Sequence, residues 1–563
     1  MSVAYRVVLL VAISLCASVR SFAQTVAQAG DDLVGLWGVE MLTGPPVRGE
    51  IVVERTSGNW TARVAGFEAS ARQSGDSVTL AFPGSAGALR VWVHGRDFHA
   101  FWVQPAGSMS PYATPVALHA AGNDAWRGDV RPIDARFSLY VSIRREADGT
   151  LTGVFRNPDF NWRGGGRSFR VERDGDNVAF IDRTTGKKRF VQPYDPAQHV
   201  ISFDFGGPVQ LRPERATEAV GFFPRSTPTP YDYRTPVDRG DGWRVARASE
   251  VGLNEARLRT TVQGIIDADP LSDTTPRIHS LLVVRHGKLV LDEYFFGYSA
   301  DHPHDLRSAS KTMTSVMAGV AMQRGAKLDM STRVAGTQIT MGNLLTHTSG
   351  KACDDDDDKS PGNEDTMQSQ QAEGDWYRYF LALPQLHEPG STRAYCSGGI
   401  NYAGHVIGMS TGMWLPAFFD RYIAQPLQIT RYGMNLMPSG DGYSGGGMHM
   451  LPRDLLKFGQ LYLDGGTWGG HRLVSADWVK RSTSPQQSVQ DGSHDGFAWH
   501  LHDVRAGAKT YATYEASGNG GQFLFVVPEL QMAIVVTAGN YGQYTAWRKI
   551  REILMPALME PGT

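Results

Sequence analysis

The chain has 563 residues, which is long for one compact core, and this length predicts two domains after removal of a leader. Its 55 basic and 57 acidic side chains nearly cancel, so neither nucleic acid nor an anionic membrane is expected as the main partner. A small, roughly neutral substrate fits this composition better. The oligomeric state stays open.

The N-terminus has the pattern of a secretory signal. An apolar run covers residues 7–15, and a small-residue cleavage pattern ends at Ala23. The run is shorter than the roughly 20 residues that a membrane-spanning helix needs, so we expect no stable membrane span. We therefore expect residues 1–23 to be a signal peptide and the mature protein to be exported, either periplasmic or secreted.

The next part of the chain, residues 24–223, predicts an antiparallel β-rich domain of unknown role, either a barrel or a sandwich. Short alternating segments such as residues 49–54 and 137–142 are separated by glycine-rich turn signals. Residues 224–244 begin with a proline-rich stretch that lacks apolar periodicity, which indicates an extended linker. We place the domain boundary in this linker.

Residues 245–563 predict an α+β domain, because strands near both ends flank a mainly helical middle. The expected elements are a helix over 254–267, strands over 280–285 and 289–295, strands over 523–527 and 532–537, and a closing helix over 546–555 that Pro556 ends.

Two serines occur in the G-x-S-x-G pattern of α/β-hydrolase nucleophiles, namely Ser410 and Ser444. That pattern requires a buried strand directly before the serine. Residues 401–407 instead have the pattern of a helix, and residues 438–442 that of a loop. We interpret Ser410 as a helix-end residue and Ser444 as a loop residue.

A third candidate nucleophile is Ser308, which forms an S-x-x-K pattern with Lys311. Residues three apart share a helix face, so Lys311 can reach the Ser308 hydroxyl and accept its proton when neutral. Apolar residues continue the helical period toward a C-cap at Gly325. Ser310 and Thr312 lie off the shared face and are interpreted as capping or packing hydroxyls. A two-residue pattern recurs by chance, so the assignment depends on other parts of the chain.

Several stretches in a fixed order make residues 245–563 resemble the serine β-lactamase and penicillin-binding superfamily. The similarity is greatest to its class C β-lactamase branch, with the S12 peptidases, family VIII esterases and 6-aminohexanoate-oligomer hydrolases. The stretches are residues 279–288, 308–311, 339–350, 395–397, 453–462 and 518–522. The resemblance implies a β-lactamase-like domain with an antiparallel sheet and a helical region, a small-molecule substrate, and no cofactor or metal.

The resemblance also implies roles for individual residues. Ser308 would attack a carbonyl and become acylated, while Lys311 and Tyr395 would share the proton transfers. Which of the two is the main base stays open. His347 and Ser349, which belong to an H-T-S-G segment, would have structural roles.

The resemblance places an oxyanion hole at the backbone amides of Ser308 and Gln522. Gly520 and Gly521 would let the strand approach closely. Asn519 would belong to the same substrate-binding segment.

Two departures from the family bear on the substrate. Ser397 stands where many relatives have an asparagine, and Asn519 stands where β-lactamases and cell-wall peptidases commonly have lysine. A neutral side chain at 519 supplies no charge for a substrate carboxylate. These changes favour an ester or an uncharged amide. The alternatives are a β-lactamase or D-amino-acid peptidase and, from another class, a non-catalytic binding or sensor module.

Cys353 is followed by five aspartates and Lys359. Runs of like charge are usually solvated loops, and the spacing of a calcium-binding EF-hand is absent, so we expect no metal here. In an exported protein Cys353 and Cys396 can form a disulfide, which would contribute about 4 kcal/mol, although two buried thiols are the alternative. A disulfide would join this loop to the neighbour of Tyr395.

Overall fold

The computed structural model describes residues 30–42, 47–94, 97–105, 111–134, 136–159, 168–205, 207–215, 217–225, 229–272 and 274–559. Residues 1–23 lie outside these ranges, so the signal peptide and export stay predictions. None of the helices in the described ranges has the length and apolar character needed to cross a membrane.

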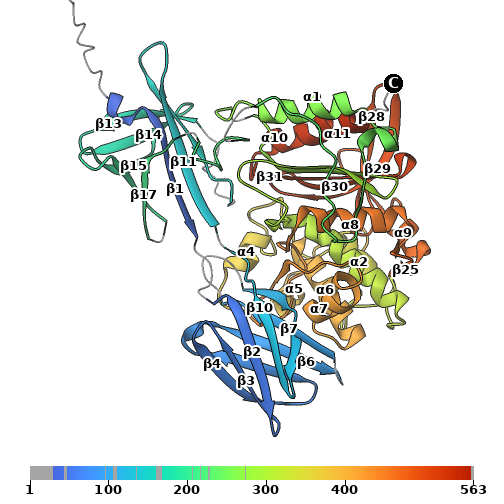
Figure 1. Cartoon of the computed structure of the whole chain (residues 1–563). Helices are drawn as coiled ribbons and strands as arrows, with labels where there is room; N and C mark the ends of the chain where they lie inside the picture. Colours follow the sequence, from blue (N-terminus) through green and yellow to red (C-terminus); the bar gives the residue numbers. More distant parts are fainter. Residues whose placement is uncertain are drawn as a thin grey trace, which may run out of the picture.

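The β-rich front of the chain contains a closed eight-stranded barrel, seen at the upper left of Figure 1. Closure leaves the barrel without exposed strand edges, and its interior is filled by aromatic side chains such as Trp37, Phe155 and Phe180. In barrel order the strands are β1 (Gly35–Leu42), β11 (Arg136–Arg145), β12 (Leu151–Arg156), β13 (Ser168–Asp174), β14 (Asn177–Asp182), β15 (Lys188–Asp195), β16 (Val200–Asp204) and β17 (Pro208–Pro213).

A second β unit is inserted between the first two strands of the barrel, and Figure 1 shows it as the blue strands at the bottom. Its core contains Trp60 and Trp126, whose rings stack 5.5 Å apart. Its strands are β2 (Gly49–Thr56), β3 (Asn59–Val64), β4 (Phe67–Arg72), β5 (Ser77–Phe82), β6 (Gly87–His94), β7 (Asp97–Val103), β8 (Tyr112–Val116), β9 (His119–Gly122) and β10 (Ala125–Val130). The predicted β-rich region therefore consists of two β units.

The inserted unit shares a sheet with the C-terminal part of the chain. Strand β8 pairs with β22 (Tyr432–Asn435), β22 pairs with β23 (His449–Met450), and β23 pairs with β21 (His304–Asp305). Because β21 lies just before Ser308, hydrogen-bonded strands connect the inserted unit to the segment that carries the candidate nucleophile.

The C-terminal part is built on a nine-stranded sheet, confirming the predicted α+β class. All neighbours are antiparallel except β18 and β20, which are parallel. In sheet order the strands are β18 (Arg244–Val245), β20 (Lys288–Tyr294), β19 (Ile278–Arg285), β31 (Met532–Ala538), β30 (Gln522–Val527), β29 (Lys509–Gly518), β28 (His500–Ala506), β27 (His494–Asp495) and β26 (Gln487–Ser488). The four strands predicted from the sequence are β19, β20, β30 and β31.

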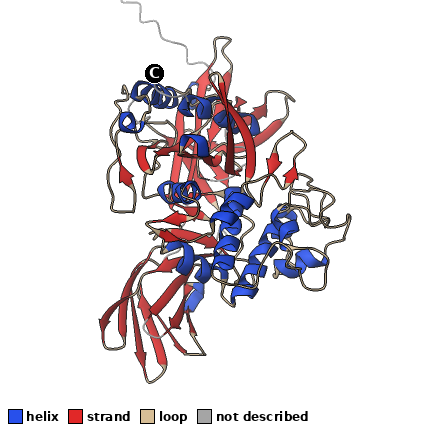
Figure 2. Cartoon of the chain, turned by 90° about the vertical axis from the view of Figure 1, so that its right-hand side faces the viewer, coloured by secondary structure: helices blue, strands red, loops and turns tan. Residues whose placement is uncertain are grey.

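Helices cover both faces of this sheet (Figures 1 and 2). One face packs on α1 (Glu255–Ile266), α10 (Tyr544–Lys549) and α11 (Met555–Met559), and the other packs on α2 (Ser310–Gln323) and α8 (Pro452–Leu463). Alternation along β19 explains the two layers, because Leu281 and Val283 join the first core while Leu282 and Val284 join the second.

The remaining helices are α3 (Met341–Leu345), α4 (Glu364–Ser369), α5 (Trp376–Ala382), α6 (Ser397–Thr411), α7 (Leu415–Phe419) and α9 (Ala476–Ser482), with a small hairpin of β24 (Thr467–Trp468) and β25 (His471–Arg472). These helices lie mainly on the side of α2 away from the nine-stranded sheet, where Figure 1 labels α5, α6 and α7.

The predicted helix over 254–267 is confirmed as α1, and Gly325 follows α2 with the positive φ of a C-terminal cap. The prediction that Pro556 ends the closing helix was wrong. A π-turn over Ile550–Leu554 interrupts that helix, so Pro556 occupies the first turn of α11. The i→i+5 turn before it, in which the Met555 amide donates to the Ile550 carbonyl, lets the helix continue through the proline.

Arg453 joins the linker to the C-terminal domain. Its side chain is 2% exposed and forms ion pairs with Asp241 at 2.6 Å and Asp292 at 2.7 Å, while its carbonyl accepts from Trp243 Nε1. Asp292 is itself 9% exposed. The arginine therefore neutralises a buried carboxylate on β20 and ties the linker to α8.

We expect Arg453→Ala to lower the free energy of unfolding by about 3–5 kcal/mol, because Asp292 would be left buried and unpaired. Chemical denaturation followed by circular dichroism measures the change. Arg127→Ala, which breaks the exposed Arg127–Glu50 pair, is the matched control and should cost less than about 1 kcal/mol. Equal effects of the two changes would contradict the role of Arg453.

Candidate active site

The candidate nucleophile lies in the short turn of 3₁₀ helix, Arg307–Ala309, that leads into α2. Ser308 Oγ is 2.9 Å from Lys311 Nζ and accepts its hydrogen bond. Ser310 and Thr312 point elsewhere, because Ser310 Oγ accepts from the Met448 amide and Thr312 Oγ1 donates to the Ala498 carbonyl. Of these hydroxyls, only that of Ser308 meets the lysine.

The serines of the two G-x-S-x-G matches lie apart from this centre. Ser410 is in the last turn of α6 and donates to the Val406 carbonyl, and Ser444 is in a loop and donates to the Ile400 carbonyl. Neither directly follows a strand, in agreement with the interpretation from sequence.

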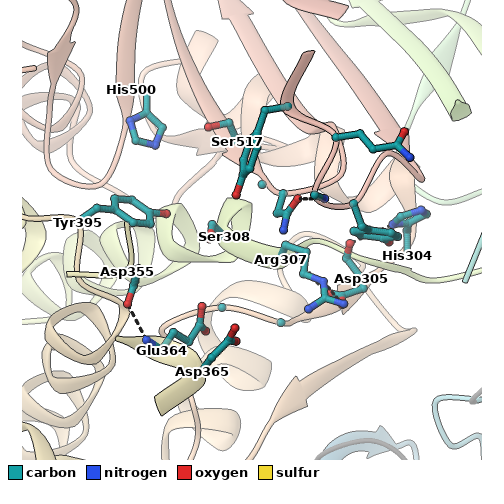
Figure 3. A pocket seen from close by; sticks show the side chains of 18 of the residues that line it. His304, Asp305, Arg307, Ser308, Asp355, Glu364, Asp365, Tyr395, His500 and Ser517 are labelled. Atoms are coloured by element: carbon teal, nitrogen blue, oxygen red, sulfur yellow. Dashed lines mark hydrogen bonds and ion pairs between the residues drawn. The ribbon is translucent and has the colours of Figure 1, made fainter. Parts of the chain in front are cut away.

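Tyr395 lies against the Ser308–Lys311 pair, with its ring centroid 4.9 Å from Lys311 Nζ. Figure 3 shows the Tyr395 side chain beside Ser308. The His347 ring packs against the Tyr395 ring, with the centroids 4.5 Å apart, and its Nδ1 accepts a hydrogen bond from the Cys396 amide. Burial lowers the pKa of His347 to about 3, so this ring is neutral and suited to accept that bond. His347 thus packs against Tyr395 and binds the amide of the next residue.

The protonation of Lys311 and Tyr395 follows from their surroundings. Burial acts to lower the pKa of Lys311, but Tyr395, Glu364 and Asp355 outweigh it, and the net pKa lies above the ordinary 10.5. Burial raises the pKa of Tyr395 above 10.0, although Lys311 and a hydrogen bond with Ser308 oppose the rise. At neutral pH Lys311 is therefore an ammonium and Tyr395 a phenol, and one proton must leave the pair before either can act as a base.

The end of β29 lies against the start of α2. A Cβ on Gly518 would be 2.4 Å from the Leu306 carbonyl oxygen and 3.1 Å from the Ala309 nitrogen, which leaves no room for a side chain. Ser517 and Gly518 line the pocket together with Ser308. Glycine at 518 therefore permits the close approach of the sheet to the nucleophile.

The geometry favours Ser517 over Gln522 as the second oxyanion donor. The Gly518 carbonyl accepts from Gly521 across the turn, so Gly518 faces β30 and the Ser517 amide is directed to the opposite edge of the strand. Pairing with β28 stops at Glu515, which leaves that edge open. Gln522 is fully buried across the hairpin, and its side chain donates to the Ala538 carbonyl.

Other residues assigned to substrate binding also differ from expectation. Ser397 is fully buried, and both its amide and its hydroxyl donate to Asp355 rather than facing the pocket. Gly520 and Gly521 form the β29–β30 turn and lie outside the pocket lining. Asn519 does line the pocket, but its Oδ1 accepts from the Gly542 amide.

The acidic run contributes a residue that sequence analysis missed. Cys353 and Cys396 are joined by a disulfide, which places Asp355 beside Tyr395 in the pocket. Asp355 also lies close enough to Lys311 to raise its pKa. The possible Cys353–Cys396 disulfide already indicated that this run lies near Tyr395, but it did not single out Asp355 among the five aspartates.

These residues open onto a cavity of about 1120 Å³. Its wall includes Tyr112 of the inserted unit and Asp159, which follows barrel strand β12, besides residues of the C-terminal domain. Tyr112 is 4% exposed and its ring stands edge-on to His449, 4.9 Å away. The β-rich front of the chain thus forms part of the pocket that contains Ser308.

Ser308 accepts a hydrogen bond from the lysine three residues later, at the start of a buried helix. A tyrosine and a sheet edge lie beside it, and this arrangement defines a class of enzyme. That class is the serine hydrolases with an S-x-x-K nucleophile.

Comparisons with known proteins identify the family. The Beta-lactamase family matches residues 279–551. A 6-aminohexanoate-dimer hydrolase of Paenarthrobacter ureafaciens is 24% identical over 330 residues, which are 52% of this chain and 84% of that protein. Residues 279–551 thus form a serine hydrolase domain of the beta-lactamase family.

Solved structures of similar proteins include a putative 6-aminohexanoate-dimer hydrolase from Bacillus anthracis, with 18% identity and a TM-score of 0.43 over 50% of this chain and 79% of that one. Another is EstCE1, a hydrolase with promiscuous acyltransferase activity, with 18% identity and a TM-score of 0.40 over 52% of this chain and 98% of that one.

We expect kcat/KM for a chromogenic short-chain ester to rise with pH through the alkaline range, by about tenfold per pH unit while the Lys311–Tyr395 pair keeps both protons. The reason is that the deprotonated pair is the active form and both pKa values are raised. Initial rates corrected for spontaneous hydrolysis measure the profile. A flat profile above neutral pH, with the fold intact, would contradict this assignment.

Gly518→Ala should reduce kcat/KM by about 100-fold, because the added methyl pushes β29 away from Ser308. Gly264→Ala is the matched control, since its Cβ meets nothing within 4 Å and it lies in α1. Rates with the same ester and the melting temperatures of both variants measure the effects. Wild-type activity in Gly518→Ala would show that the close approach is not required.

Proposed function

We propose that this protein is an exported serine hydrolase that cleaves an ester or an uncharged amide through a covalent acyl-serine intermediate. The observation that carries the proposal is the 2.9 Å contact between Ser308 Oγ and Lys311 Nζ, with Tyr395 against it, at the wall of the cavity. Ser308 attacks the substrate carbonyl, and the Lys311–Tyr395 pair takes its proton and returns it to the leaving group.

The oxyanion of the tetrahedral intermediate is stabilised by the amides of Ser308 and Ser517. Each preorganised donor of this kind typically contributes roughly 3–4 kcal/mol to the transition state. Water then attacks the acyl-enzyme, with the same pair acting as base, and releases the acid product.

The charges of the cavity support a neutral substrate over an anionic one. Acidic side chains outnumber basic ones among the described lining residues, by ten to five. Three of the five arginines are already paired with carboxylates, namely Arg307 with Asp305, Arg393 with Asp495 and Arg551 with Glu515. No lysine occurs among these lining residues. Repulsion thus disfavours substrates that carry a carboxylate near the scissile bond.

The name of the relative from Paenarthrobacter ureafaciens gives one amide substrate class to try first, the dimer of 6-aminohexanoate. For this chain we propose only the broader class of linear amides and esters.

We expect Ser308→Ala to lower ester turnover by at least about 10⁴-fold, because it removes the nucleophile, whose hydroxyl oxygen accepts the hydrogen bond from Lys311 Nζ. Peptide mapping after a fluorophosphonate probe should locate the label at Ser308. Ser410→Ala is the control and should keep wild-type turnover, because its hydroxyl bonds only within α6.

Other outcomes separate the alternatives. Full activity of Ser308→Ala would disprove the mechanism. Cephalosporin turnover at the rate of ester turnover would favour a β-lactamase, and labelling of Ser308 without turnover of any ester or amide would favour a binding or sensor module.

A further inference from the structure

The five aspartates after Cys353 do not form one uniform solvated loop. Asp357 is exposed, and its Oδ1 accepts from the Lys359 amide within the same turn. Asp355 is half-buried and faces the pocket below Tyr395 (Figure 3). Asp356 and Asp358 also line the pocket, so the run as a whole borders the site, and Asp355 is distinguished by the contacts of its carboxylate.

The Asp355 carboxylate binds the first residues of two helices. Oδ2 accepts from the Ser397 amide at 2.7 Å and from Ser397 Oγ at 2.6 Å, and Oδ1 accepts from the Glu364 amide at 2.8 Å. Ser397 begins α6 and Glu364 begins α4, so neither amide has a partner within its helix. A negative charge at a helix N-terminus is also favourable electrostatically. The carboxylate is therefore held firmly by three hydrogen bonds.

These contacts hold the backbone of Tyr395 and of the two residues that follow it. The Asp355 amide donates to the Tyr395 carbonyl at 2.8 Å, and the Asp355 carboxylate holds Ser397, two residues after the tyrosine. The disulfide between Cys353 and Cys396 ties the same two segments together. The position of Tyr395 relative to Ser308 thus depends on the segment that contains Asp355.

The charge of Asp355 also acts on the catalytic pair. It raises the pKa of both Lys311 and Tyr395. Burial and the charge of Glu364 raise the pKa of Asp355 itself to about 6, opposed by Lys311 and by the bonds from Ser397. At neutral pH Asp355 is mostly ionised, and its charge favours retention of the Lys311 proton.

We propose that Asp355 is a positioning residue, which fixes Tyr395 against the Ser308–Lys311 pair through Ser397 and through its own backbone. The role rests on the proposed function, because it needs Tyr395 to take part in proton transfer. Asp355 itself touches neither the nucleophile nor, in this role, the reacting carbonyl.

The test compares Asp355→Asn with Asp357→Asn, which makes the same chemical change in the exposed part of the same run. Asparagine offers a single acceptor oxygen, so it cannot keep the bonds to both Ser397 and Glu364. In the wild-type background we expect Asp355→Asn to lower kcat for a chromogenic short-chain ester by about 100-fold with little change in KM. Asp357→Asn should keep the wild-type values.

The pH profile distinguishes positioning from a purely structural role. Loss of the negative charge lowers the pKa of Lys311 and of Tyr395, so the alkaline rise of kcat/KM should move to lower pH in Asp355→Asn. In Ser397→Ala the charge remains and one bond to Asp355 is lost, so kcat should fall while the alkaline rise stays in place. This second variant tests the role even if Asp355→Asn does not fold.

Wild-type kcat and an unmoved profile in Asp355→Asn would overturn the proposal. So would a loss of activity that merely follows a lower melting temperature, with the profile unmoved, or wild-type kcat in Ser397→Ala. Absence of ester and amide turnover in the wild-type protein would instead contradict the proposed function, so the two failures are distinguishable.

Discussion

The active site depends on the contact between Gly518, at the end of β29, and the backbone of Leu306 and Ala309, just around Ser308. Because no side chain fits between them, the sheet reaches the turn that carries the nucleophile. Only at that distance can an amide of the strand and the amide of Ser308 approach the same substrate oxygen. The large apolar layer between α2, α8 and the sheet also stabilises this contact between β29 and the turn around Ser308.

Buried charge is the second constraint. Lys311 is 3% exposed and remains charged only because Tyr395, Glu364 and Asp355 surround it. Three different segments supply these partners: the loop before α6, helix α4 and the acidic run. The disulfide joins two of those segments. The positive charge of Lys311 therefore depends on the local fold that places these three segments around Tyr395.

The β-rich front of the chain is structurally continuous with the hydrolase domain. The inserted unit extends a sheet through β8, β22, β23 and β21, which ends three residues before Ser308. Through this sheet Tyr112 reaches the wall of the cavity. Residues of both β units, including Tyr112 and Asp159, thus form part of the pocket wall.

The sequence by itself determined the α+β class, strands β19, β20, β30 and β31, and the Ser308–Lys311 pair, because periodicity and i, i+3 spacing are local properties. Tyr395 and the β-lactamase-like fold also followed, through resemblance. Only the tertiary structure decided that Gly518 lies against the turn around Ser308 while Gln522 is buried across the hairpin, that Ser397 turns to Asp355, and that the front of the chain is two β units. These features depend on hydrogen-bond register and on contacts between distant segments, and local sequence patterns do not encode either.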